Sequence, residues 1–132
     1  MSLRPAVIVH GLADALTALA PGLPVTLLSA RGAALYGGCG WWQALVAAAR
    51  AAYPATVAED LLDCADAPGR ALEALRCGIK GLILDPDCPA FPAVQRAATA
   101  AGARLLSAAP PALDLFERGA ARRLAAWLEP PG

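Results

Sequence analysis

The sequence has little charge and few of the side chains on which most enzymes depend. Charged residues make up 17% of its 132 residues, and eleven basic side chains balance eleven acidic ones. His10 is the only histidine, Lys80 is the only lysine, and there are three serines. Without a basic excess the chain is a poor match for a phosphate backbone, so we expect no nucleic-acid partner.

Long uninterrupted apolar runs and cysteine motifs are also missing. Charged side chains such as Asp14, Arg31 and Arg50 interrupt the apolar stretches, so we expect no membrane-spanning segment. His10 and Asp14 break the first apolar run before it reaches the length of a secretory signal. The four cysteines form no CxxC pair. We therefore predict a cytoplasmic protein whose thiols stay reduced.

What the sequence does have is apolar residues, at 58% of the chain. A chain this apolar buries enough surface to fold, which excludes disorder, and its length suits a single domain over 1–132. Zero net charge and a low charge density leave little electrostatic repulsion between copies. We therefore expect a homo-oligomer.

Five short, almost continuous apolar runs predict strands that are buried on both faces. Helical patterns separate them, and this alternation favours a parallel sheet with helices on both faces. The fold expected is α/β: a three-layer, doubly wound, five-stranded sheet with the flavodoxin-like order 2-1-3-4-5. The predicted strands cover 6–10, 25–29, 61–63, 82–85 and 103–107, and the predicted helices cover 13–20, 41–53, 67–77, 90–101 and 114–129.

The spacing of the strand ends singles out one connection. Most strand-helix units take about twenty residues, but the second takes roughly a dozen more, which form the segment 30–40. This insertion follows a strand, so it emerges at the carboxyl edge of the sheet, where open α/β folds bind their ligands. A long connection in a compact domain is often functional. The alternative is a contact with a neighbouring subunit.

Several residues of this insertion suit the binding of an anion. Glycines let backbone N–H groups turn toward a ligand, a helix N-terminus favours negative charge, and the Arg31 guanidinium adds a fork of donors. The spacing is not that of a P-loop or a dinucleotide fingerprint. We assign as candidate ligand-binding residues Arg31, Gly37, Gly38, Cys39, Gly40 and Trp41.

The candidate catalytic residues follow three of the strands. The imidazole of His10 suits a general base, while Asp63 and Asp85 end neighbouring strands. The sequence contains no GxSxG motif, which a serine hydrolase of the α/β type would be expected to have. Two close carboxylates also suit a divalent cation, although the cysteine spacing does not suit zinc. No resident metal is assigned and no cofactor is identified.

These patterns predict a small-ligand-binding protein of unassigned activity, with a polar or anionic metabolite bound at the carboxyl edge under the insertion. Two alternatives stay open. One is a non-catalytic oligomeric protein whose insertion and tryptophans make subunit contacts. The other is a divalent-metal-dependent enzyme that uses Asp63 and Asp85. The sequence does not decide whether the protein is an enzyme.

Overall fold

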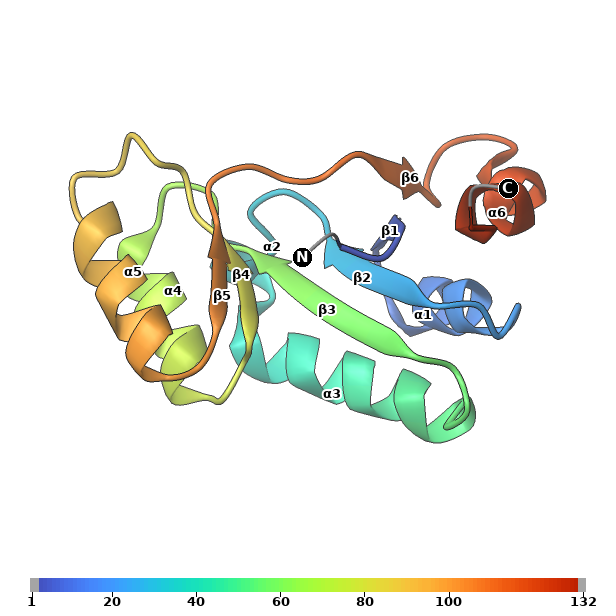
Figure 1. Cartoon of the computed structure of the whole chain (residues 1–132), viewed down its shortest axis with the longest axis horizontal. Helices are drawn as coiled ribbons and strands as arrows, with labels where there is room; N and C mark the ends of the chain where they lie inside the picture. Colours follow the sequence, from blue (N-terminus) through green and yellow to red (C-terminus); the bar gives the residue numbers. More distant parts are fainter. Residues whose placement is uncertain (1–2, 131–132) are drawn as a thin grey trace.

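The computed structural model describes residues 3–130, and the strands in this part form one parallel sheet (Figure 1). The order across the sheet is β5-β4-β3-β2-β1-β6. Every neighbouring pair is parallel, which confirms the predicted α/β architecture. The strands are β1 (Ala6–Val9), β2 (Val25–Ser29), β3 (Ala58–Asp63), β4 (Gly81–Ile83), β5 (Arg104–Leu106) and β6 (Ala112–Asp114).

The predicted strand number, order and layering are wrong. A sixth strand, β6, pairs with β1, and the order 2-1-3-4-5 does not occur. From β1 to β5 the sheet grows in one direction, because each new strand lies beside the strand that precedes it in the chain. Right-handed crossovers between such strands all place their helices on the same face of the sheet. The helices are α1 (Leu12–Leu19), α2 (Ala33–Tyr36), α3 (Gly38–Ala52), α4 (Pro68–Arg76), α5 (Phe91–Ala100) and α6 (Ala120–Leu128).

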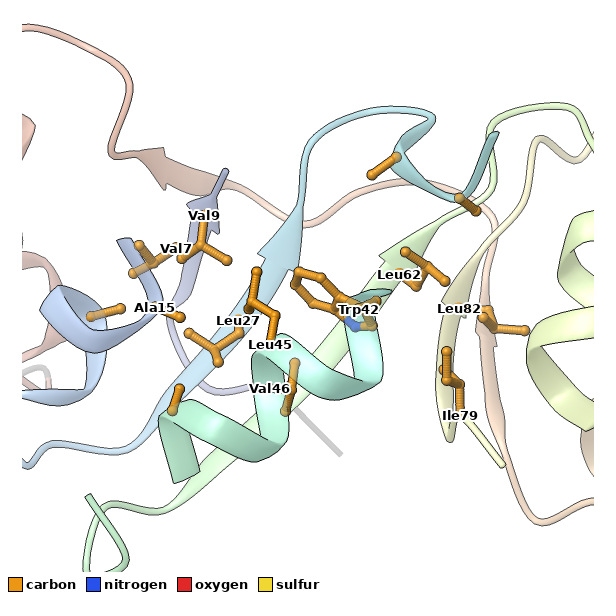
Figure 2. Packing of buried hydrophobic residues seen from close by; sticks show 14 of the residues in the cluster. Val7, Val9, Ala15, Leu27, Trp42, Leu45, Val46, Leu62, Ile79 and Leu82 are labelled. Atoms are coloured by element: carbon orange, nitrogen blue, oxygen red, sulfur yellow. The ribbon is translucent and has the colours of Figure 1, made fainter. Parts of the chain in front are cut away.

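Two apolar clusters on opposite faces of the sheet show this one-sided arrangement. The larger cluster contains buried residues from all six helices together with alternate residues of the strands, such as Val7, Leu27 and Leu62. Figure 2 shows Trp42 of α3 among Leu27 and Leu62 in this core. Within residues 3–130 the smaller cluster, built on Leu28, Leu61 and Ile83, includes no helix residue. The protein therefore has two layers.

A short link from β5 to β6 crosses the face of the sheet that the helices leave open (Figure 1). These two strands lie at opposite edges, about 24 Å apart on a flat sheet. The link 107–111 with its junctions reaches at most about 22 Å. The sheet must therefore curl toward the link, all the more because the link bends at Ser107 and Ala108 before it reaches Pro110 and Pro111.

Two stretches of the chain differ from their predicted structure. The segment 30–40 is not a loop: it contains α2 and the first turn of α3, and Ala33 and Ala34 of α2 are buried in the core. The last predicted helix starts late because residues 112–114 form β6, and α6 begins only after Gly119, which has a left-handed φ of 79°. Every helix within residues 3–130 is too short or too polar to cross a bilayer.

Candidate functional site

A cavity of about 240 Å³ lies at the carboxyl edge of the sheet, and we call it the carboxyl-edge cavity. It lies against the ends of β2 to β4 and is bordered by the start of the β5–β6 link. Three of the candidate residues from the sequence, Arg31, Asp63 and Asp85, are on its wall. The complete lining is Arg31, Asp63, Ala65, Ile83, Asp85, Pro86, Ser107, Ala108 and Ala109.

Asp63 is the most firmly held polar group of this cavity. Its side chain is buried, and its Oδ1 accepts hydrogen bonds from Gly32 N at 3.1 Å and Ala65 N at 2.8 Å. Its backbone N–H donates to Ser29 Oγ at 2.9 Å. Within residues 3–130 its Oδ2 has no hydrogen-bond partner. Every fully enclosed side-chain oxygen in this part of the chain does have a partner. The Oδ2 of Asp63 is therefore not fully enclosed, and Asp63 is one of the residues that line the cavity.

Ala65 joins the loops that follow β3 and β4. Its φ of 50° lies in the left-handed region, which a residue with a side chain adopts at a cost of about 1 kcal/mol or more. In this conformation Ala65 N donates to Asp63 Oδ1, and Ala65 O accepts from Asp85 N at 2.8 Å. This strained residue fixes the distance between the two aspartate-bearing loops.

The remaining polar groups of the cavity are less constrained. Asp85 Oδ1 accepts from Asp87 N at 2.9 Å, which closes a tight turn after β4. Arg31 is exposed and forms no ion pair within the part of the chain described. Ser107 adds one hydroxyl from the link. The cavity thus combines one guanidinium with two carboxylates, which suits a ligand that has both an anionic group and hydrogen-bond donors.

His10 lies elsewhere on the same edge and does not line this cavity. Its Nε2 is 2.7 Å from Asp114 Oδ1 at the adjacent ends of β1 and β6, a distance at which an Nε2–H donates to the carboxylate. The ring packs against Phe116 with centroids 5.6 Å apart. Sequence reasoning missed Asp114 because it was assigned to the last helix. The available signal was an apolar run ending in an acidic residue, as in the third and fourth strands.

The glycine-rich segment also lies away from the carboxyl-edge cavity. Gly37 separates α2 from α3, and Gly38, Cys39 and Gly40 form the first turn of α3. A Cβ at Gly37 would lie 2.5 Å from a ring carbon of Trp41, so this glycine is needed for packing. None of these residues is among those that line the cavity. Their proposed contact with a ligand therefore has no support from the cavity geometry.

The thiols differ sharply in their surroundings. Burial, with the neighbouring Asp63 carboxylate, raises the pKa of the Cys64 thiol to about 12. Burial, with Cys77 close by, raises the pKa of the Cys39 thiol to about 11. Cys77 itself is exposed and Cys88 is partly exposed. Within residues 3–130 no three histidine, cysteine or acidic side chains gather in a way that would hold a metal ion.

We expect alkylation to distinguish these thiols in the folded protein. The thiolate is the reactive form, so a pKa of about 12 lowers the thiolate fraction of Cys64 at pH 8 about a thousandfold from that of an ordinary thiol. Iodoacetamide at pH 8, followed by peptide mass mapping, should modify Cys77 first and leave Cys39 and Cys64 until the protein is unfolded. Equal rates at Cys64 and Cys77 would contradict the burial described here.

The comparisons with known proteins assign no family to this chain. No protein-family model matches this chain, and no curated protein matches its sequence significantly.

Proposed function

We propose that the protein binds a small polar metabolite in the carboxyl-edge cavity. The observation that supports this proposal is the arrangement of Asp63, which lines the cavity: its Oδ1 is fixed by two backbone donors, while its Oδ2 accepts from no group of the described residues and is not fully enclosed. Asp85 and the Arg31 guanidinium lie on the same wall. Such a convergence of polar groups in a concave site is typical of ligand-binding pockets.

The lining favours a ligand with two kinds of polar group. A carboxylate or phosphate of the ligand pairs with the Arg31 guanidinium, while hydroxyl or amino groups donate to Asp63 and Asp85. A purely anionic ligand would be repelled by the two carboxylates. At about 240 Å³ the cavity is small even for a metabolite site, which excludes dinucleotides and polymers.

Ligand-observed NMR with a panel of small carboxylated and phosphorylated hydroxy and amino compounds tests this proposal. We expect saturable binding that Asp63→Asn weakens at least about tenfold, because a carboxylate that accepts from a ligand is worth about 1.5 to 3 kcal/mol. Asparagine keeps an oxygen for the donors at Gly32 and Ala65, so the variant should fold. Arg31→Gln should weaken the anionic members of the panel by a similar factor.

Matched controls separate this cavity from general charge effects. Asp66→Asn removes a charge from the exposed neighbouring loop, and Arg76→Gln removes one from the end of α4. His10→Gln removes the imidazole that pairs with Asp114. All three should bind as the unaltered protein does. If the controls weaken binding as much as Asp63→Asn, or if no compound of the panel binds, the proposal is wrong.

Self-association is a second candidate function, favoured by exposed apolar side chains around α2. Tyr36 is 72% exposed, Leu35 46% and Trp41 37%, and all three lie close together in the sequence. Zero net charge adds no repulsion between copies. If a second copy covers this surface, light scattering should give a dimer or larger species, and Tyr36→Lys with Leu35→Lys should return the monomer. A monomer at all concentrations would exclude this candidate.

A further inference from the structure

A second and larger cavity, of about 310 Å³, lies at the opposite edge of the sheet, and we call it the amino-edge cavity. It shares no lining residue with the carboxyl-edge cavity. Its walls come from the first half of β3, from the beginnings of β4 and β5, and from α3. The lining is Leu3, Arg50, Ala58, Glu59, Asp60, Leu61, Lys80, Gly81, Gly102 and Arg104.

The cavity lies where β3, which pairs with β2 on one edge and with β4 on the other, begins before β4 does. Residues 58–61 of β3 pair with β2, but β4 pairs only with Leu62 and Asp63. The first residues of β3 therefore extend past the start of β4 on the amino-terminal side, and Gly81 lies close to Asp60 at the point where β4 begins. Arg50 donates to Ala58 O at 2.7 Å on this unpaired edge. The strands of the sheet thus contribute much of the lining, and connecting residues such as Lys80 and Gly102 complete it.

Both carboxylates in the cavity wall are already paired with arginines. Arg4 Nη1 lies 2.6 Å from Glu59 Oε1, and Arg50 Nη2 lies 3.0 Å from Asp60 Oδ1. The second oxygen of Asp60 accepts from the indole N–H of Trp42 at 3.2 Å. Each carboxylate of this wall therefore already has one cationic partner.

Two cations of the same wall have no acidic partner. Lys80 Nζ donates only to the neutral Ala101 O, at 2.7 Å, and Arg104 forms no side-chain hydrogen bond or ion pair within the described residues. Their backbones lie side by side, because Arg104 N donates to Lys80 O at 2.8 Å and Arg104 pairs in register with Gly81, and both residues line the cavity. In a chain of zero net charge this is a local excess of two positive charges.

We propose that the amino-edge cavity binds a phosphate group, either as the free ion or as part of a small phosphomonoester. A phosphate carries close to two negative charges at pH 7, which matches the unpaired charges of Lys80 and Arg104. The planar guanidinium of Arg104 suits two parallel hydrogen bonds to phosphate oxygens, and Lys80 adds a point charge. Leu3 and Leu61 border the remaining space, which accommodates an apolar substituent of a monoester.

Titration of ¹⁵N-labelled protein with inorganic phosphate, and separately with phenyl phosphate, tests this inference at constant ionic strength. We expect saturable amide shifts centred on Lys80, Gly81 and Arg104. Lys80→Gln and Arg104→Gln should each weaken binding about tenfold, the effect of losing one charge-assisted hydrogen bond. Arg104→Lys keeps the positive charge but loses the planar guanidinium, so its affinity for phosphate should fall between that of the unaltered protein and that of Arg104→Gln. Tighter binding of phenyl phosphate would identify a phosphomonoester, and equal binding the free ion.

Arg96→Gln on the exposed face of α5 and Arg76→Gln on α4 are the controls, since each removes one charge without touching the cavity. Both should bind phosphate as the unaltered protein does. Because Lys80 is exposed, Lys80→Gln leaves the core intact and keeps the test valid even if Arg104→Gln unfolds. Shifts that do not saturate, or equal weakening by Arg96→Gln, would overturn the proposal. Neither result bears on the carboxyl-edge cavity.

Discussion

Replacing Trp42 with alanine is expected to lower the free energy of unfolding by about 3–5 kcal/mol, a large part of what a domain of this size has. Trp42 is fully buried, and it is the largest of the fully buried side chains. It fills the space between α3 and the sheet (Figure 2). The truncation leaves a cavity in the larger cluster, and Asp60 Oδ2 loses its indole donor at 3.2 Å.

The neighbouring tryptophan provides the matched control for this experiment. Trp41 is 37% exposed and packs against Trp42 with ring centroids 5.9 Å apart. Trp41→Ala should therefore cost about 1 kcal/mol, mostly from the lost aromatic contact. Urea denaturation followed by circular dichroism gives both values in the same assay. Similar losses for the two variants would show that Trp42 is not the packed member of the pair.

This asymmetry could be predicted from the sequence alone. Adjacent residues of a helix point about 100° apart, so Trp41 and Trp42 cannot both enter one core. The approximate positions of β1 to β5 were also predictable, because buried parallel strands are almost continuously apolar. All five residues of β2 are buried, as its sequence indicates. Because the strands are parallel, their carboxyl ends lie at the same edge of the sheet, and Arg31, Asp63 and Asp85 are therefore expected there.

The strand order was not predictable, because it depends on where each crossover places the next strand and no local pattern encodes that. β6 was missed because Ala112–Asp114 is only three residues long and follows two prolines, which favoured an interpretation as link and helix start. The first half of β3 was missed for a physical reason as well. Glu59 and Asp60 are charged, and they are tolerated in a strand because that half of β3 faces the amino-edge cavity.

The candidate site was predictable only as far as it depends on the parallel sheet. His10 was grouped with Asp63 and Asp85 because all three follow strands, but β1 lies two places from β3 and next to β6. Its carboxylate partner is consequently Asp114, which the expected five-stranded fold does not bring to this edge. The amino-edge cavity gave no sequence signal, since it depends on how far β3 extends past the start of β4.

Gly81→Ala is expected to destabilise the protein by about 3 kcal/mol or more through steric overpacking. A Cβ at this position would lie 2.3 Å from the Asp60 carbonyl oxygen and 2.9 Å from a methyl carbon of Leu61. The carbonyl is backbone, so it moves only if β3 and β4 separate. That movement would disturb the pairing of Leu62 with Leu82, where these strands first join. Denaturant titration monitored by circular dichroism measures the loss.

Gly40→Ala makes the same chemical change where the structure has room for it. No atom lies within 4 Å of a Cβ built at Gly40, which is exposed in the first turn of α3. Alanine there should raise stability by about 0.5–1 kcal/mol, since glycine is the poorer helix former. A loss of stability in Gly81→Ala together with a gain in Gly40→Ala is expected only if β4 lies close to Asp60. Gly81 and Asp60 also form part of the wall of the amino-edge cavity. If Gly81→Ala is as stable as Gly40→Ala, β3 and β4 do not meet as described, and the phosphate site proposed between them loses its basis.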